Sequence, residues 1–284
     1  MSNVIVANKY RLTKKIGEGS FGKIYLATYK DNKERLDEKS STSVITSDVF
    51  AIKIMTSNNE RYIINELSIY EKIKGIKNVP SLYESGKEGK YNYMVMELLE
   101  QSLEDLRKSY GEQMSLKVVI HLSLQMLIII EQIHEKGIIH RDLKPANFLL
   151  KTNESNISEI YLIDFGLARC FLDDKQRHYS LITNEDIVGT RRYMSINTHQ
   201  GISSSRRDDI ESFVYIMMFL YYGGLPWQNQ KSVKDVVTIK EELKWSMEVV
   251  GEFILILIYA RNLGFTDKPN YIYIRNVLNN LASV

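Results

Sequence analysis

The stretch that decides the fold is residues 140–147, which read His140-Arg141-Asp142-Leu143-Lys144-Pro145-Ala146-Asn147. Phosphoryl transfer needs a carboxylate that orients the attacking hydroxyl and accepts its proton, and Asp142 is suited to that role. The same chemistry needs an oxygen ligand for a metal ion, which Asn147 can supply. Lys144 is placed to contact the transferred phosphate. His140 is more typical of a packing residue than of a general base in this motif, and we assign it no chemistry.

Downstream, the tripeptide Asp164-Phe165-Gly166 follows a short apolar segment, Ile160–Ile163, that predicts a strand. An aspartate at this place would bind Mg²⁺ that bridges the β- and γ-phosphates of a nucleotide. In isolation such a tripeptide is a common turn. Its order and spacing after the first motif favour the metal-binding reading, with Asn147 and Asp164 as the predicted ligands.

Upstream lies the glycine-rich segment Gly17-Glu18-Gly19-Ser20-Phe21-Gly22. Glycines let the backbone approach a polyphosphate without collision with a side chain. The motif alone is weak evidence, because it also marks dinucleotide-binding folds, where a helix follows the last glycine. Here residues 23–28 read as a strand. Two strands joined by such glycines form the hairpin that covers nucleotide phosphates in protein kinases, although an ordinary glycine turn explains the segment alone equally well.

Lys53 stands in the predicted strand Val49–Ile54, where a lysine would ordinarily just be exposed. A functional role is indicated by Glu66, which falls on the inner face of the predicted helix 60–74 and could pair with Lys53. Such a Lys–Glu pair holds the lysine against the α- and β-phosphates of ATP. Ile24 and Ala51 would then provide apolar surface over the adenine.

The order and spacing of these motifs predict an α+β fold, the bilobal protein kinase fold, in a single domain over residues 1–284. The predicted strands are Arg11–Ile16, Lys23–Tyr29, Val49–Ile54, Ser81–Glu88 and Tyr91–Glu97. Together with the helix at 60–74, which Gly75 stops, they make residues 1–97 a small β-rich N-lobe with one main helix. Residues 98–284 predict a larger, mainly α-helical C-lobe. The charged and then Ser/Thr-rich residues 30–48 predict a solvated insertion.

The composition is that of a globular protein. The 284 residues are 44% hydrophobic and 25% charged, with a formal net charge of +2, so charge gives no argument for binding nucleic acid. The most apolar runs, Val118–Ile133 and Phe253–Ala260, are interrupted by polar residues or too short, so we expect core helices and no membrane insertion. Ile210–Tyr222, apolar nearly all round, predicts a helix at the centre of the core. We expect no signal peptide.

Further motifs make the chain resemble one group of protein kinases, the casein kinase 1 family. Most kinases carry A-P-E after the activation segment, whereas this chain reads Ser195-Ile196-Asn197, a hallmark of that family. The other matches are Ser102-Leu103-Glu104-Asp105-Leu106, Asn147-Phe148-Leu149, Ser205-Arg206-Arg207-Asp208-Asp209-Ile210-Glu211-Ser212, Leu225-Pro226-Trp227-Gln228 and Asp267-Lys268-Pro269. The resemblance to protein kinases covers the whole chain, and these motifs are specific to the one family.

The resemblance implies a Ser/Thr protein kinase that uses ATP and Mg²⁺, and Lys144 is a feature of Ser/Thr rather than Tyr kinases. The catalytic residues that it implies are Lys53, Glu66, Asp142, Lys144, Asn147 and Asp164. The implied ATP-binding residues are Ile16, Gly17, Gly19, Gly22, Ile24, Ala51, Lys53, Met96, Glu97, Leu99, Leu149 and Ile163. Met96 would be the gatekeeper, and Leu99 would bond adenine through its backbone.

Family members favour a target Ser/Thr that lies C-terminal to an acidic or phosphorylated residue. The implied anion site consists of Arg141, Arg169 and Arg192. Two positions that are usually basic read Thr238 and Glu185 here. A charge-assisted hydrogen bond is worth about 1.5–3 kcal/mol, so we expect a weaker dependence on a primed substrate than is typical of the family. Compensation by nearby lysines stays open, and the candidates are Lys231, Lys234 and Lys240.

Two other classes of function compete with this interpretation. A kinase-like scaffold without useful catalysis would usually lack one of the catalytic residues, and none is missing here. A small-molecule kinase is disfavoured by Thr190 after Gly189 and by the Ser195-Ile196-Asn197 segment, which shapes a ledge for a peptide. The family relationship implies a monomer in the cytoplasm, the nucleus or both. Asp209 is expected to steady the backbone of the catalytic loop, and the lone Cys170 receives no role.

Overall fold

The computed structural model describes residues 4–19, 22–30, 49–56, 60–153, 155, 158–243 and 250–282. The chain divides into two compact units, residues 1–100 and 101–284, and each is described by itself. The division falls close to the expected lobe boundary at residue 97. Of the predicted insertion at 30–48, all but Lys30 lies outside the described residues.

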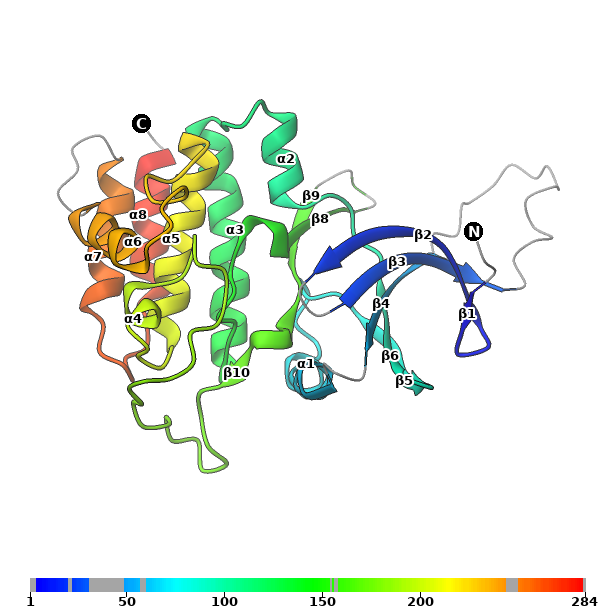
Figure 1. Ribbon diagram of the computed structural model, residues 1–284. Coiled ribbons are helices and arrows are strands. Elements are labelled where there is room, and N and C mark those ends of the chain that lie inside the picture. The colour runs from blue at the N-terminus through cyan, green and yellow to red at the C-terminus, as the bar shows by residue number, and fades with distance from the viewer. Residues whose placement is uncertain are drawn as a thin grey trace. The chain divides into compact units, whose positions relative to one another are not determined.

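The first unit is built on an antiparallel sheet with the strand order β1-β2-β3-β4-β6-β5 (Figure 1). Its strands are β1 (Ile5–Val6), β2 (Tyr10–Gly19), β3 (Gly22–Tyr29), β4 (Val49–Thr56), β5 (Leu82–Glu88) and β6 (Tyr91–Glu97). All five predicted strands are confirmed. β2 continues past its predicted end at Ile16, because its pairing with β3 extends to the pair Gly19 and Gly22. The glycine-rich segment therefore ends a two-stranded hairpin.

The two faces of this sheet carry different side chains. Tyr10, Tyr29 and Phe50 pack ring against ring on one face, with centroids 5.0 to 5.6 Å apart. Because side chains alternate along a strand, Ala51 and Lys53 of β4 point to the opposite face. That opposite face is the one on which the sequence places the nucleotide-binding residues.

The main helix of the first unit is α1 (Glu60–Ile73), which contacts β4. Its buried residues, Ile63, Glu66, Ile69, Tyr70 and Ile73, recur at the helical spacing that the sequence predicts. The helix ends just before Gly75, whose φ of +89° lies in the left-handed region that favours glycine. This confirms the predicted stop.

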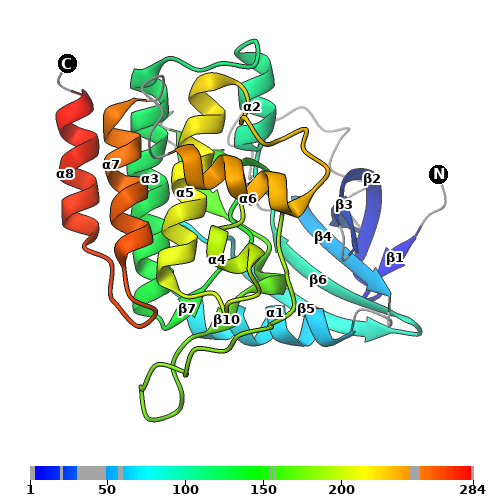
Figure 2. The ribbon, with the colours of Figure 1, turned by 60° about the vertical axis from the view of Figure 1, so that its left-hand side comes forward.

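The second unit is mainly helical (Figure 2). Its helices are α2 (Leu103–Ser109), α3 (Leu116–Glu135), α4 (Ile196–His199), α5 (Arg206–Tyr222), α6 (Val233–Glu242), α7 (Gly251–Asn262) and α8 (Tyr271–Ala282). α3 packs against α5 and α8, and α7 packs against α5 and α8, so these four helices run side by side (Figure 2). The two units together have the predicted α+β architecture.

Helix α5 forms the centre of the second unit, as its sequence predicts, because every residue from Asp208 to Leu220 is buried. The helix starts at Arg206, ahead of the predicted start at Ile210. The reason is a cap, in which the carboxylate of Asp208 accepts from the backbone nitrogen of Ser205 at 2.7 Å and the backbone nitrogen of Asp208 donates to the carbonyl of Ser205 at 3.1 Å. The cap adds a polar first turn that an apolar pattern does not reveal.

Helix α3 is long and apolar enough to cross a membrane by length and composition alone. Half of its apolar window is nevertheless buried inside the second unit, where it packs against α5, α8 and β9. Two of its polar side chains, Ser123 and His134, are also buried and hydrogen-bonded. These contacts are those of a core helix.

Two short antiparallel strand pairs frame the motifs of the second unit. They are β7 (Ile138–Ile139) with β10 (Arg169–Cys170), and β8 (Phe148–Thr152) with β9 (Ser158–Leu162). The chain from residue 140 to 147 connects β7 to β8 and includes the 3-10 helix η4 (Pro145–Asn147). The chain from 163 to 168 connects β9 to β10 and includes η5 (Phe165–Leu167). The strand pairing therefore brings these two connections together.

Candidate active site

The connection at 140–147, called the catalytic loop from here on, is held by a carboxylate from α5. Asp209 accepts hydrogen bonds from the backbone nitrogens of His140 at 2.7 Å and Arg141 at 3.0 Å. It also contacts Nε2 of His134 at 3.0 Å. Burial alone would raise the pKa of Asp209, but these partners hold it below its ordinary value. The expected role of Asp209 in steadying this loop is confirmed.

The carboxylate of Asp142 has partners on both of its oxygens. Oδ1 accepts from the backbone nitrogen and from the hydroxyl of Thr190, each at 2.7 Å. Oδ2 accepts from Nζ of Lys144 at 2.5 Å. Asp142 is 8% exposed, so its carboxylate is fixed in orientation at the edge of solvent. A fixed carboxylate of this kind can receive a proton from a hydroxyl group brought to it.

The two predicted metal ligands come from the two connections. The backbone N–H of Ile163 donates to the carbonyl of Asn147 at 2.9 Å, which places Asp164 one residue beyond that link. The side-chain nitrogen of Asn147 donates to the carbonyl of Asp142 at 2.9 Å. Since the amide nitrogen is occupied, the side-chain oxygen of Asn147 is the atom available to a cation. Amide and carboxylate oxygens are ligands that suit Mg²⁺.

Asp164 is in the left-handed region of the backbone, with φ +66° and ψ +69°. A non-glycine residue in this conformation is strained and needs support from its surroundings. The support comes from Phe165, which is fully buried and packs edge-on against His140 at 5.2 Å. Nε2 of His140 also lies 3.1 Å from the carbonyl oxygen of Ile163. His140 is thus a packing residue, as predicted.

The implied anion site is only partly brought together. Glu185 forms ion pairs with both Arg169 and Arg141, the latter at 3.6 Å between Nη1 and Oε1. Arg192 lies elsewhere, with its guanidinium over the ring of Phe219 at 5.2 Å. In the described part of the chain Arg192 forms no ion pair with a carboxylate. Two of the three arginines therefore share one carboxylate of the protein itself, which offsets one of their two positive charges.

In the first unit, Lys53 and Glu66 form a buried ion pair. Nζ of Lys53 lies 3.0 Å and 2.7 Å from the two carboxylate oxygens of Glu66. The side chains are 7% and 1% exposed, so the predicted pair exists and is shielded from water. Bidentate contact of this kind orients a lysine ammonium and offsets the loss of hydration of both charges.

The three glycines of the hairpin differ in what their surroundings require. A Cβ at Gly22 would meet the carbonyl oxygen of Ile54 at 2.5 Å, so internal packing demands glycine there. A Cβ at Gly17 would make only ordinary contacts with Ile24, and one at Gly19 would meet nothing within 4 Å. Neither Gly17 nor Gly19 has a positive φ. Packing within the described residues thus gives no reason for these two glycines, and close approach of a ligand to the backbone would.

The predicted adenine-contacting residues of the first unit share the face of Lys53. Ile24 is paired across β3 and β4 with Lys53, and Ala51 is paired across β4 and β6 with Met96. Beyond β6, the backbone N–H and C=O of Leu99 make no hydrogen bond within the described residues, as a hinge that bonds a ligand requires. The remaining predicted residues of this unit, Ile16 and Glu97, are exposed and half-buried respectively. In the second unit, Leu149 and Ile163 are half-buried.

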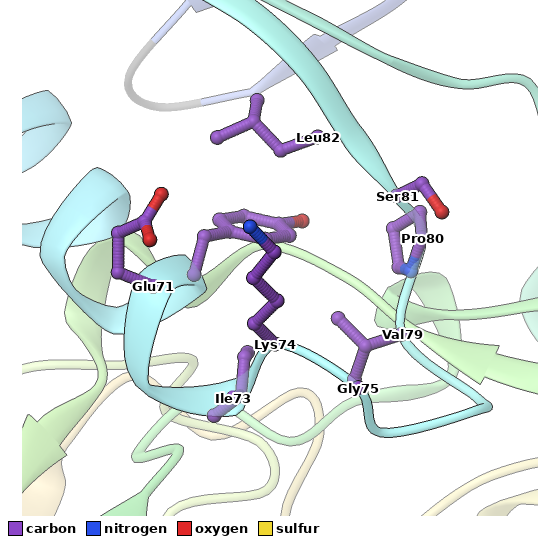
Figure 3. Close-up of a pocket in the computed structure, with 9 residues that line it drawn as sticks. Glu71, Ile73, Lys74, Gly75, Val79, Pro80, Ser81 and Leu82 are labelled. Carbon is purple, nitrogen blue, oxygen red and sulfur yellow. The ribbon is translucent and has the colours of Figure 1, made fainter.

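A pocket of about 150 Å³ opens elsewhere in the first unit, between the end of α1 and the start of β5 (Figure 3). Glu71 and Lys74 border it on the helix side, and Pro80 and Leu82 on the strand side. It contains none of the predicted site residues. Pockets for ligands of drug size usually measure roughly 300–1,000 Å³, so this one is too small for a nucleotide.

Sequence reasoning missed how residues 195–197 are held. Ser195 donates to Oδ1 of Asp208 at 2.6 Å, and Nδ2 of Asn197 contacts the same oxygen at 3.2 Å. The sequence did contain a signal for this contact, because residues 195–197 and Asp208 each belong to a motif quoted above. Lys240, considered as a possible anion ligand, is fully buried, which removes it from that role.

Comparison with known families agrees with this geometry. Residues 10–262 match the family described as "Protein kinase domain". The match covers most of the chain, and the chain therefore belongs to the protein kinase domain family. The predicted fold class is confirmed, as are phosphotransferase activity and ATP binding at the level of the family.

Proposed function

We propose that the protein is a Ser/Thr protein kinase of the casein kinase 1 type, which transfers the γ-phosphate of ATP to Ser or Thr in acidic protein substrates. The observation that carries the proposal is the environment of Asp142, whose two oxygens are held by Thr190 and Lys144. A lysine at this place favours Ser/Thr over Tyr as acceptor, because the resemblance assigns it to kinases of that class. Residues 195–197 support the family.

In this proposal each of the predicted catalytic residues has one role. Asp142 orients the acceptor hydroxyl and takes its proton, and Lys144 is adjacent to bind the γ-phosphate. Lys53, held by Glu66, binds the α- and β-phosphates. Asn147 and Asp164 would hold Mg²⁺, which when bound neutralises charge on the phosphates. Mg²⁺ held there would take its further ligands from nucleotide phosphates and water.

The substrate preference that we propose is for acidic peptides with little dependence on priming. Glu185 places a carboxylate against Arg141 and Arg169, where a phosphate of a primed substrate would otherwise bind. A phosphate must displace or repel this carboxylate to reach the arginines. Arg192, half-buried and without a carboxylate partner in the described chain, remains to attract acidic side chains.

The test is transfer of labelled phosphate from Mg-ATP to three peptides that differ only in carrying Ser, Thr or Tyr at the acceptor position. We expect transfer to Ser and Thr peptides, at most trace transfer to Tyr, and none by Asp142→Asn. Efficient transfer to the Tyr peptide would overturn the assigned specificity. Binding of ATP without transfer to any of the three would favour the alternative function, a scaffold that uses the kinase fold for interactions.

A further inference from the structure

Residues 189–194, called the substrate segment from here on, precede α4 in the chain and contact the catalytic loop. At its start, Gly189 has a φ of +106°, and a Cβ there would lie 2.6 Å from the carbonyl oxygen of Arg141. The next residue, Thr190, makes the two hydrogen bonds to Asp142. The segment is therefore packed directly against the catalytic loop, so a shift in one is transmitted to the other.

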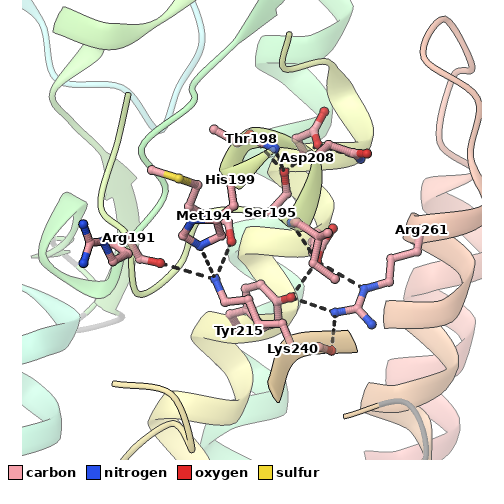
Figure 4. Close-up of polar contacts among 12 residues, drawn as sticks. Arg191, Met194, Ser195, Thr198, His199, Asp208, Tyr215, Lys240 and Arg261 are labelled. Carbon is pink, nitrogen blue, oxygen red and sulfur yellow. Dashed lines mark hydrogen bonds and ion pairs between the residues drawn. The ribbon is translucent and has the colours of Figure 1, made fainter. Parts of the chain in front are cut away.

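A lysine from α6 holds the remainder of the segment from inside the protein (Figure 4). Nζ of Lys240 donates to the carbonyl oxygen of Met194 at 2.6 Å and to that of Arg191 at 3.3 Å. Its third contact, at 3.1 Å, is Nε2 of His199 in α4. Lys240 is 0% exposed, although a lysine is almost never fully buried without a carboxylate partner.

The surroundings of Lys240 explain how a buried ammonium group is tolerated. Nζ lies over the rings of Tyr215 at 4.7 Å and Trp227 at 5.1 Å, and aromatic faces attract cations. The other charged neighbours are Glu211 of α5 and Arg261 of α7, which pair with each other at 3.2 Å. Burial, more than these charges, lowers the pKa of Lys240 to about 7. Burial lowers that of His199 to about 4, so the imidazole is neutral.

The protonation state of Lys240 decides how many contacts it can make. Nζ faces two carbonyl oxygens and Nε2 of His199, and an ammonium group has a donor for each of the three when that nitrogen is unprotonated. A neutral amine has two donors and a lone pair, so with Nε2 of His199 unprotonated one of the three partners loses its donor. A buried carbonyl that loses its donor is destabilised, and the segment that carries it is free to move.

We propose that Lys240 is a positioning residue for phosphotransfer, whose ammonium group holds the carbonyls of Arg191 and Met194 and thereby fixes the substrate segment beside Asp142 for peptide binding. The inference rests on the proposed transfer to a protein hydroxyl. Lys240 does not touch the reacting atoms, and it acts through the segment.

Three variants test the proposal. Lys240→Met keeps the apolar stem and removes the ammonium group, Lys240→Arg keeps the charge, and Lys117→Met changes an exposed lysine of α3 as the matched control. We expect Lys240→Met to raise the peptide KM about tenfold or more, with the ATP KM within about twofold of wild type. Lys240→Arg should recover part of the loss, and Lys117→Met should behave as wild type. An unchanged peptide KM in Lys240→Met overturns the proposal.

A second readout needs no catalysis and therefore separates this inference from the proposed function. The backbone nitrogens of Tyr193 and Met194 donate to the carbonyl of Thr190 inside the segment. Hydrogen exchange at these two amides should be less protected in Lys240→Met than in wild type or Lys117→Met. Wild-type protection of these amides in Lys240→Met overturns the proposal that Lys240 holds the substrate segment. Lost protection supports the proposal even if no peptide is phosphorylated.

The pH profile covers the case in which Lys240→Met fails to fold. For a peptide without titratable groups near neutrality, the wild-type peptide KM should rise as the pH passes upward through about 7, while the ATP KM stays level. In Lys240→Arg the peptide KM should show no such rise, because a guanidinium stays charged. The same rise in Lys240→Arg as in wild type would overturn the proposal.

Discussion

Thr190 donates two hydrogen bonds to one carboxylate oxygen of Asp142, from its backbone nitrogen and from its hydroxyl, both at 2.7 Å. The other oxygen is occupied by Lys144. The proposed proton acceptor is thus oriented by the segment that the peptide is proposed to contact. The same two hydrogen bonds therefore hold the substrate segment in place and align the carboxylate of Asp142.

The first prediction removes half of this link. Thr190→Ala deletes the hydroxyl donor but keeps the backbone donor, and a hydrogen bond to a charged group is worth about 1.5–3 kcal/mol. We expect kcat to fall about tenfold or more with little change in the ATP KM, whereas Thr190→Ser, which keeps the hydroxyl, should stay close to wild type. Equal kcat values for the Ala and Ser variants would show that the hydroxyl does not orient Asp142.

The second prediction concerns the buried pair Lys53 and Glu66. Lys53→Met leaves a carboxylate buried without its cation, which costs about 3–5 kcal/mol of unfolding free energy. Adding Glu66→Leu should restore much of that loss, since a well-packed apolar pair can replace a buried ion pair. Denaturant unfolding measures both effects. The control is the exposed pair Lys87 and Glu60, where Lys87→Met should cost less than about 1 kcal/mol. Equal losses at the two sites would contradict the burial argument.

The third prediction concerns the dependence of stability on pH. The folded protein holds the pKa of Lys240 at about 7, below the ordinary lysine value of 10.5 that applies to the unfolded chain. Between these values the unfolded chain binds more protons, so this group makes stability rise with pH, by up to about 1.4 kcal/mol per unit. The difference in unfolding free energy between wild type and Lys240→Met should therefore increase from pH 7 upward. A difference independent of pH would mean that Lys240 titrates normally.

The fourth prediction concerns Glu185. Glu185→Gln removes the carboxylate that pairs with Arg141 and Arg169, and a phosphate can then bind both. We expect the preference for a primed over an unprimed peptide to increase about tenfold, because at least one charge-assisted hydrogen bond becomes available. Asp173→Asn, which breaks the exposed pair with Arg177, is the control and should leave the preference unchanged. An unaltered preference in Glu185→Gln would show that a primed phosphate does not use this site.

The sequence predicts the helices and strands whose residue types follow a regular pattern. It misses those that depend on individual contacts between distant residues. The β-branched and aromatic residues of Val49–Ile54 and the apolar face of residues 60–74 give β4 and α1 close to their observed bounds. The two-residue strands β7 and β10 are too short for any periodicity, and they exist because the residues before the catalytic loop pair with those after the connection at 163–168. A sequence pattern cannot predict a strand that forms only because a distant segment pairs with it.

The candidate site divides in the same way. Motifs fixed the identity of Asp142, Asn147 and Asp164, because each chemical role demands one residue type at one spacing. The position of Lys240 was not predictable, since an amphipathic helix ordinarily places lysine on its exposed face. The pairing of Glu185 with two arginines was also missed. The sequence shows an acidic residue at a usually basic position but not which cations it reaches.

The measurement that tests the central claim most directly is phosphate transfer from Mg-ATP to a Ser peptide with an acidic stretch upstream. Wild type is compared with Asp164→Asn, and the same peptide is also supplied with a phosphorylated residue three positions before the target. We predict transfer by wild type, none by the variant at equal thermal stability, and a primed preference well below about a hundredfold, since Glu185 blocks the contribution of one or two charge-assisted hydrogen bonds. Absence of transfer by wild type, although ATP raises its melting temperature, would contradict the account.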